Sequence, residues 1–295
     1  MKAQSILIAV CSLSVCLLSS LQGQTSWTSR TSGTGSNLNS VVYGNGTYVA
    51  VGQVGVILTS TNGTSWTSRT SGTNNPLYGV TYGNSLFVAV GDNGTIVKSS
   101  DGTTWSTASS GTSSHLTSIV WSGSKFVVGM ETSSVLTSAN GSSWSSSSTG
   151  STNFMWGEGF GNSTYVGVGE VGTILTSTNG TSWTARTSGT SNDLLGITYG
   201  NSTYVAVGWV GTVRTSSNAT SWSSVTSGTS SDLRGITYGA VFVTIGTGGV
   251  ILTSSNASSW TSRTSGTSSA LNAVIYGNSL YVAVGDSGVI LTSSS

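Results

Sequence analysis

The chain has 295 residues, of which 36% are hydrophobic and only 6% are charged, and its formal net charge is +1. Ten Trp and ten Tyr exclude the aromatic-poor composition of a disordered chain. The near-zero charge gives no basis for nucleic-acid binding, which requires clustered Lys and Arg. Abundant Gly, Ser and Thr, with few helix-forming residues, predict an all-β chain with many turns.

The first element in chain order is a targeting segment. Lys2 precedes an apolar run from Ile6 to Leu21, and Gly23 follows. This pattern predicts a secretory signal peptide over residues 1–23 and a secreted mature chain, either extracellular or periplasmic. The apolar run is shorter than the ~20 residues of a membrane span, so no span is expected in the mature chain. Both Cys lie in this segment, which leaves the mature chain without a disulfide or a thiol.

Residues 24–295 consist of seven copies of one unit. A Trp recurs at intervals of 39 residues, with a last interval of 38: Trp27, Trp66, Trp105, Trp144, Trp183, Trp222 and Trp260. A second block, typified by residues 43–52, recurs between these Trp residues. Sequence repeats of this length are typical of β-propellers and solenoids.

Each unit contains four short β-patterned runs separated by turn residues. In the first unit these strands A to D are expected at Leu38–Tyr43, Tyr48–Val51, Val56–Thr59 and Ser65–Arg69. Asn and Gly in the turns accept the positive φ that tight hairpins need. A four-stranded meander of about 40 residues is the size of one propeller blade.

The two ends of the repeat are complementary. The seventh unit stops after its third strand, and Ser26–Arg30 carries the pattern of the missing fourth strand. We therefore predict a seven-bladed β-propeller of four-stranded blades in which the N-terminal strand completes the last blade. Such closure removes an exposed sheet edge, whereas an open stack has no need of complementary ends.

The hairpin between the third and fourth strands carries a family resemblance. Ser99-Ser100-Asp101-Gly102-Thr103-Thr104-Trp105 resembles the Asp-box of BNR-repeat propellers, which include sialidases, sortilin-type receptors and the photosystem II assembly-factor type. Gly91-Asp92-Asn93-Gly94-Thr95-Ile96 is also similar to the assembly-factor type. Other units carry Asn in place of Asp101. The resemblance implies the propeller fold, and its members differ widely in function.

Three positions of the unit vary strongly, and all three fall at the same predicted end of the ring. The B–C turn position reads Gln53, Asp92, Glu131, Glu170, Trp209, Thr247 and Asp286. The position early in strand A reads Asn39, Tyr78, Thr117, Trp156, Leu195, Arg234 and Asn272. The position in the D–A loop reads Asn37, Pro76, His115, Phe154, Asp193, Asp232 and Ala270.

From these positions we select candidate binding residues of three kinds, namely aromatic platforms, acids and one Arg. They are Tyr78, Phe154, Trp156 and Trp209, then Asp92, Glu131, Glu170 and Asp286, and finally Arg234. Large apolar groups at exposed repeat positions favour a ligand-binding face. Blade four is the most diverged, and we expect any specificity in blades three to five. The alternative is that the acids are solubilising turn residues on a face of drifted repeats.

These observations predict a secreted, monomeric and non-catalytic propeller that binds a protein or a glycan through one face. A glycoside hydrolase using Asp92, Glu131 and Glu170 is an alternative, and a protein assembly factor is another. The hydrolase could also be sialidase-like, but the resemblance implies that such a site needs an Arg cluster for the substrate carboxylate. Only Arg214 and Arg234 lie outside the repeated Arg residues of the predicted outer strand, which are Arg30, Arg69, Arg186 and Arg263. His115 is the only His, so no metal site and no cofactor are expected.

Overall fold

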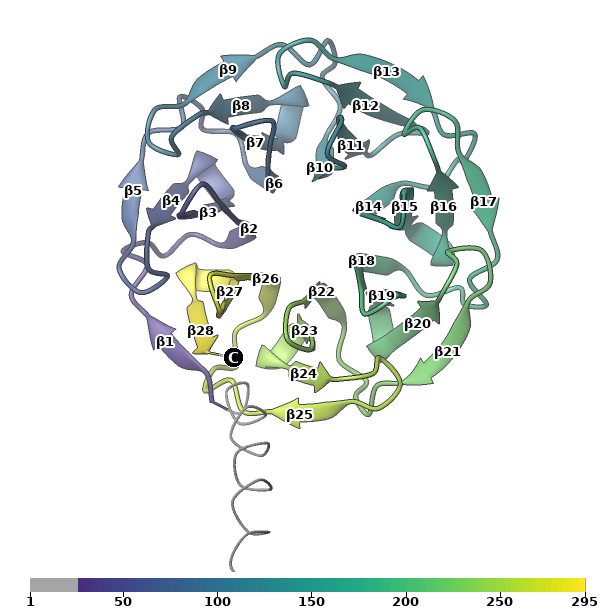
Figure 1. The fold of residues 1–295 in the computed structure, drawn as a ribbon. Helices are drawn as coiled ribbons and strands as arrows, with labels where there is room; N and C mark the ends of the chain where they lie inside the picture. Colours follow the sequence, from purple (N-terminus) through teal and green to yellow (C-terminus); the bar gives the residue numbers. More distant parts are fainter. Residues whose placement is uncertain (1–25, 295) are drawn as a thin grey trace, which may run out of the picture.

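The computed structural model describes residues 26–294, and the predicted signal peptide over residues 1–23 lies outside this range. Seven antiparallel sheets of four strands are arranged in a ring (Figure 1). The predicted seven-bladed propeller is therefore confirmed. Within residues 26–294 the helices are six single 3-10 turns, and none of them is long or apolar enough to cross a membrane.

The strands follow the predicted order A to D from the channel outwards in every blade. The A strands are β2 (Leu38–Gly44), β6 (Leu77–Gly83), β10 (Leu116–Trp121), β14 (Met155–Gly161), β18 (Leu194–Gly200), β22 (Leu233–Tyr238) and β26 (Leu271–Gly277). The B strands are β3 (Thr47–Gly52), β7 (Leu86–Gly91), β11 (Phe126–Met130), β15 (Thr164–Gly169), β19 (Thr203–Gly208), β23 (Phe242–Gly246) and β27 (Leu280–Gly285). The C strands are β4 (Ile57–Ser60), β8 (Ile96–Ser99), β12 (Ser134–Ser138), β16 (Ile174–Ser177), β20 (Thr212–Ser216), β24 (Ile251–Ser254) and β28 (Ile290–Ser294). The D strands are β5 (Thr67–Arg69), β9 (Ser106–Ala108), β13 (Ser145–Ser148), β17 (Thr184–Arg186), β21 (Ser223–Thr226), β25 (Thr261–Arg263) and β1 (Thr28–Arg30).

The last blade is completed by the N-terminal strand, as predicted. Strand β1 pairs antiparallel with β28, with Thr28 opposite Thr292. The two strands lie side by side in Figure 1 although they come from opposite ends of the chain. Trp27, next to β1, is buried with Tyr281 in the core of this blade, and their ring centroids are 6.4 Å apart.

The hydrophobic core lies between neighbouring blades. The B strands are buried almost throughout, which explains their nearly continuous apolar sequences. In each blade an aromatic residue of strand A, one of strand B and the repeated Trp form a ladder. In blade one this is Tyr43, Tyr48 and Trp66, with centroid separations of 4.5 and 6.4 Å. The repeated Trp therefore packs against the sheet and supports the fold.

One blade interface contains a carboxyl group. Six interfaces pack a Val or Ile of strand B against a Val or Ile of the next strand A, as Val51 does with Val80. Between blades three and four these positions hold Gly129 and Glu158. A Cβ on Gly129 would lie 2.0 Å from Glu158 Oε1, so the carboxyl occupies the space of the absent side chain.

Burial governs the protonation of Glu158. Its Oε1 is buried without a hydrogen-bond partner, and its Oε2 accepts a hydrogen bond from the Ser118 hydroxyl. Burial raises the pKa of Glu158 from 4.5 to about 7, with the Ser118 hydroxyl and the Gly129 amide acting in the opposite direction.

The C–D hairpins are fixed by one polar side chain each. Asp101 Oδ1 accepts hydrogen bonds from the amides of Thr103 and Thr104, at 2.8 and 2.9 Å. Asn62 Oδ1 accepts the equivalent bonds in blade one at 2.9 and 3.0 Å. Hydrogen bonds from Thr103 and Thr104 hold the pKa of Asp101 well below its usual range. Asp and Asn therefore serve the same turn function here.

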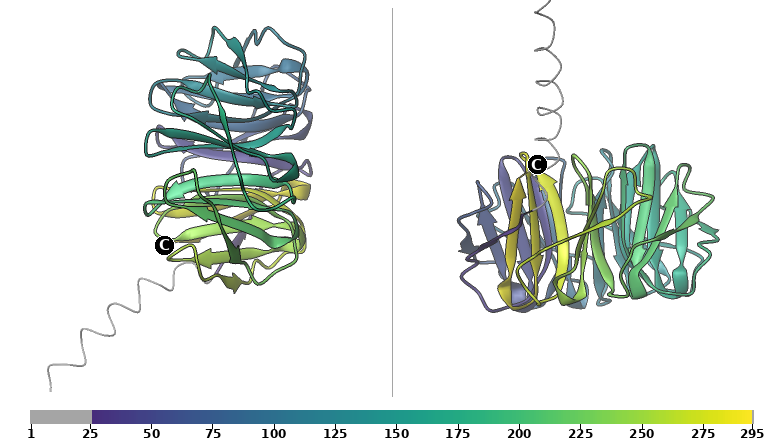
Figure 2. Two further views of the ribbon diagram at one scale, coloured as in Figure 1. Left: turned by 90° about the vertical axis from the view of Figure 1, so that its right-hand side faces the viewer. Right: turned by 90° about the horizontal axis from the view of Figure 1, so that it is seen from below.

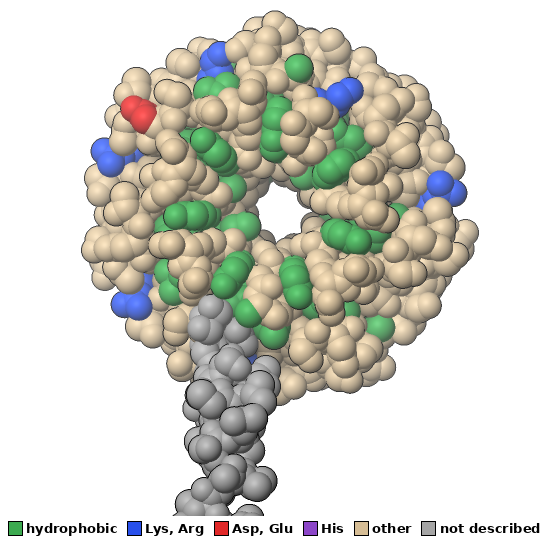
Figure 3. Space-filling model, viewed as in Figure 1, with side chains coloured by type: hydrophobic (Ala, Val, Ile, Leu, Met, Phe, Trp, Pro, Cys, Tyr) green, Lys and Arg blue, Asp and Glu red, His purple; other side chains and the backbone are tan. Residues whose placement is uncertain are grey.

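All connections gather at the two ends of the ring (Figure 2). We call the end with the A–B and C–D hairpins the hairpin face, and the end with the B–C turns and D–A loops the variable face. Figure 3 shows the hairpin face, where apolar side chains surround the open channel and Lys and Arg lie at the periphery. Acidic side chains are scarce in this view.

Candidate functional site

The variable position of strand A is a β-bulge in every blade. Leu38 lies opposite Gly52 and Ser40 lies opposite Val51, so that Asn39 is left unpaired between them. A bulge bends its strand and redirects the extra side chain. The register shift recurs at the same place in all seven inner strands, at Asn39, Tyr78, Thr117, Trp156, Leu195, Arg234 and Asn272.

Six of these seven bulged residues line one cavity of about 370 Å³, which we call the mouth pocket. Only Leu195 does not contribute. His115 from a D–A loop and Glu131 from a B–C turn complete the lining. The full set is Asn39, Tyr78, His115, Thr117, Glu131, Trp156, Arg234 and Asn272.

The structure brings together four of the nine predicted candidates in this pocket, namely Tyr78, Glu131, Trp156 and Arg234. The other four lining residues were not among our candidates. They are polar and smaller, yet each occupies a variable position of the unit. They could have been found by selecting every residue at the variable positions of the repeat unit, whatever its type.

Asp92 is not a lining residue of the pocket but adjoins two residues that are. It contacts Nδ1 of His115 and accepts a hydrogen bond from the Tyr78 hydroxyl. Burial is the main cause that raises the pKa of Tyr78 to about 12. The charge of Asp92, the hydrogen bond to Asp92 and the charge of Glu131 act in the same direction. Tyr78 therefore stays protonated as a donor, and Asp92 is engaged by these two lining residues.

On the opposite side, Arg234 is held by a neutral amide. Its Nη1 donates to Asn272 Oδ1 at 2.7 Å, and Asn272 Nδ2 donates to Asp286 Oδ1 at 2.9 Å. Asp286 thus orients Asn272 and lies outside the pocket lining. Within residues 26–294 the ion-pair geometry is met only by His115 and Asp92, so Arg234 and Glu131 line the pocket as unpaired charges.

The remaining candidates lie beside the pocket. Phe154 contacts Trp156 edge to face, with centroids 6.2 Å apart. The Phe154 amide donates to Glu170 Oε2 at 3.3 Å, so Glu170 supports this loop. Trp209 lies in the B–C turn η4 (Trp209–Gly211) and is half exposed.

Two further acids of the variable face are turn residues. Asp193 Oδ1 accepts a hydrogen bond from the Val171 amide at 2.9 Å, and Asp232 Oδ1 accepts one from the Val210 amide at 3.0 Å. Each acid thereby fastens the B–C turn of the preceding blade. For these two residues the alternative interpretation, that the acids serve the turns, describes the structure.

Exposed apolar side chains collect on the variable face. Among residues 26–294, the large hydrophobic residues that are exposed all belong to B–C turns: Val54, Val171, Trp209 and Val210. The valines lie in η1 (Gln53–Gly55), η3 (Glu170–Gly172) and η4. Large exposed apolar side chains gathered in the turns of one face are typical of an interaction surface.

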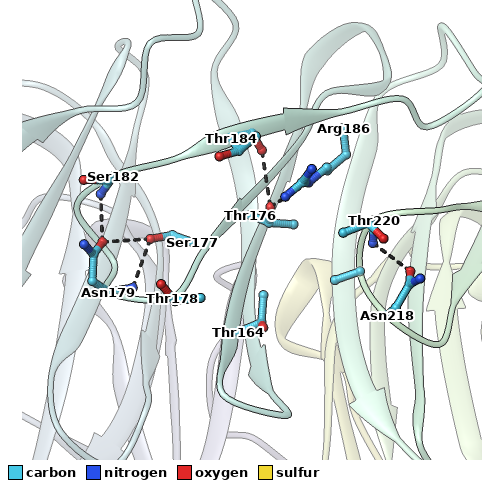
Figure 4. A pocket seen from close by; sticks show the side chains of 11 residues that line it. Thr164, Thr176, Ser177, Thr178, Asn179, Ser182, Thr184, Arg186, Asn218 and Thr220 are labelled. Atoms are coloured by element: carbon cyan, nitrogen blue, oxygen red, sulfur yellow. Dashed lines mark hydrogen bonds between the residues drawn. The ribbon is translucent and has the colours of Figure 1, made fainter.

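Grooves on the other side of the molecule repeat from blade to blade. One groove of about 410 Å³ lies between the C–D hairpins of blades four and five (Figure 4). Its polar groups are engaged with one another, as Arg186 Nε donates to Thr176 Oγ1 and the Ser182 amide donates to Asn179 Oδ1. An equivalent groove follows between blades five and six. These grooves reflect the shared scaffold and do not distinguish one blade from another.

Residues 26–294 contain no group of three or more His, Cys, Asp or Glu side chains placed to hold a metal ion.

No protein-family model and no curated protein sequence matches the chain. Solved structures do share its fold. "YCF48 bound to D1 peptide" has a TM-score of 0.76 at 15% identity, covering 91% of this chain and 95% of the other. YCF48 from Cyanidioschyzon merolae has a TM-score of 0.73 at 14% identity, covering 91% and 98%. Virginiamycin B lyase from Staphylococcus aureus has a TM-score of 0.81 at 9% identity, covering 92% and 99%. These likenesses show the propeller fold, and the similarity to Asp-box propellers stays a prediction.

Proposed function

We propose that this propeller is a non-catalytic binding module that holds a segment of another protein at its variable face. The observation that carries the proposal is the convergence of six diverged bulge residues on one cavity. A scaffold alone does not require this divergence, because the bulge itself is kept in all seven blades. The mouth pocket would anchor the partner through the Trp156 ring and the unpaired charges of Glu131 and Arg234.

A protein ligand is favoured over a glycan by the exposed aliphatic side chains in the B–C turns of the variable face. Exposed valines on protruding turns suit apolar side chains of a protein, whereas sugars stack on flat aromatic rings. YCF48 bound to the D1 peptide is a propeller of similar fold with a peptide ligand. We further propose that this protein is exported, is monomeric and acts as an assembly or scaffold factor for its partner.

The glycoside hydrolase alternative is less well supported by the contacts of the acids. Two-carboxylate hydrolysis needs one acid to donate a proton and another to attack or to activate water. Asp92 is engaged by Tyr78 and His115, and Glu170 accepts a bond from a backbone amide. This leaves Glu131 as the one free acid in the pocket lining.

The test is a binding screen with residues 24–295. The protein is presented to a displayed library of random dodecapeptides and, in parallel, to a glycan array. We expect selected peptides whose affinity falls at least tenfold in Trp156→Ala and in Arg234→Ala. Leu195→Ala is the matched control, because Leu195 is the one bulged residue outside the pocket lining.

The outcomes separate the hypotheses. Peptide binding that is insensitive to Trp156→Ala and Arg234→Ala would reject the pocket as the site. A glycan ligand that depends on these residues would replace the protein partner by a sugar. Binding of neither ligand class would overturn the proposal.

A further inference from the structure

The B–C turns of blades four and five carry exposed apolar side chains in adjacent blades of the variable face. Val171 is 61% exposed, Val210 is 61% exposed and Trp209 is 47% exposed. Asp193 connects the two turns through two hydrogen bonds of 2.9 Å. Its Oδ1 accepts one from the Val171 amide, and its backbone carbonyl oxygen accepts the other from the Trp209 amide. We call Val171, Trp209 and Val210 the apolar ridge.

The two valines of the ridge have a backbone conformation that is unfavourable for valine. Their φ angles are +52° and +54°, in the left-handed region that β-branched residues rarely adopt. The equivalent position holds Asn93, Gly248 or Ser287 in three other blades, residues that tolerate this region better, and a third valine, Val54, in blade one. Since the valine side chains are exposed, they gain no packing within the ring that would offset the strain.

Hydrogen bonds within the propeller hold the backbone of the ridge. The Thr173 amide donates to the Glu170 carbonyl at 2.9 Å within η3. The bond from the Val210 amide to Asp232 fixes η4 in the same way that Asp193 fixes η3. A preorganised apolar surface loses little conformational entropy when it binds.

Acids border the ridge without basic partners. Glu170 precedes Val171 in η3, while Asp193 and Asp232 hold the turns from the adjacent loops. None of the three forms an ion pair within the described part of the chain. The surface therefore combines aliphatic and aromatic groups with a negative border, which is complementary to apolar and positively charged side chains.

We infer that the apolar ridge is a second contact surface that binds a basic, apolar peptide segment of the partner, next to the segment anchored in the mouth pocket. The inference rests on the proposed function, because it places the partner on the variable face. Apolar side chains of the segment lie on Val171, Trp209 and Val210, and its Lys or Arg side chains lie at the bordering carboxylates.

The experiment uses residues 24–295 and dodecapeptides selected from a displayed random library. The test variant is Val171→Asn with Val210→Asn, which removes the apolar groups and keeps a residue that this turn accepts, as at Asn93. Val54→Asn is the matched control, since Val54 has the same conformation in blade one, outside the ridge. We expect peptides rich in Lys, Arg and apolar residues, a loss of affinity of at least tenfold in the test variant, and no change in the control.

The mouth-pocket variant Trp156→Ala separates this inference from the proposed function. Loss of affinity in Trp156→Ala but not in the ridge variant would overturn the ridge and leave the pocket. Selected peptides that are acidic or uniformly polar would also overturn it. Loss in the ridge variant alone would support the ridge and reject the pocket, and no loss in either would reject both.

Discussion

The contact of Glu158 with Gly129 gives the sharpest test of how neighbouring blades pack. The pKa of Glu158 is about 7 in the folded chain, against 4.5 for a free Glu. Each pKa unit corresponds to about 1.4 kcal/mol of differential stability, so the shift amounts to about 3 kcal/mol. Because the folded-state pKa is raised, the unfolded chain releases the proton first. The penalty is therefore absent below pH 4.5, grows between pH 4.5 and 7, and is complete above pH 7.

The assay is urea unfolding of the wild type and of Glu158→Gln at about pH 4 and about pH 8. The amide cannot ionise, so the variant lacks the penalty. We expect its advantage over the wild type to be about 3 kcal/mol larger at the higher pH than at the lower. The other titrating groups are common to both proteins and cancel in this comparison. A difference between the two proteins that does not change with pH would refute the reasoning.

Substitution at Gly129 tests the geometry of the same contact. Gly129→Val alone places a Cβ 2.0 Å from Glu158 Oε1, and we expect a destabilisation of about 1–3 kcal/mol. Combining it with Glu158→Val restores the aliphatic pair found at the six other interfaces. The double variant should then be more stable than Gly129→Val and should lose the pH dependence. Strictly additive effects of the two substitutions would show that the residues do not share this space.

Three further predictions concern the turns, the closure and the pocket. Val54→Asn should raise the free energy of unfolding by about 1 kcal/mol, because Val54 has φ +56° and is 63% exposed. Thermal unfolding tests this, and a lower melting temperature would contradict it. Deletion of residues 24–33 removes β1 and should cause aggregation in gel filtration through the exposed edge of β28, so an unchanged soluble monomer would argue against closure. Asp92→Asn removes a carboxylate beside Tyr78 and should lower the pKa of that phenol from about 12. Ultraviolet difference titration measures this pKa, with Tyr78→Phe identifying the signal of Tyr78. An unshifted titration would disprove the contact.

The architecture could be predicted because the chain repeats with a regular period. A Trp at intervals of 39 residues sets the number of blades, and the pattern of Ser26–Arg30 sets the closure. Both signals can be read without any knowledge of long-range contacts. The alternation of hairpins and loops alone predicted which connections lie at each end of the ring. This assignment placed all variable positions on one face.

The site was predicted only in part, because its details depend on contacts across blades. The sequence marks Trp156 and Arg234 as divergent, but it does not show that a bulge turns both toward one cavity. It marks Asp193 as an acid, but its role depends on a backbone amide 22 residues earlier. The Gly129 and Glu158 departures are visible in the repeat, yet they become one feature only when the blade interface is known.

The closure of the ring determines the order in which the molecule can be completed. Arg30 on β1 donates to Thr292 on β28 across a separation of 262 residues. During synthesis β1 emerges first and has no partner until the last strand has left the ribosome. Blades one to six consist of local hairpins and can form as they appear, whereas the seventh waits for β28. Closure is thus a high-contact-order step, and β1 stays unpaired while the twenty-six strands between it and β28 are synthesised.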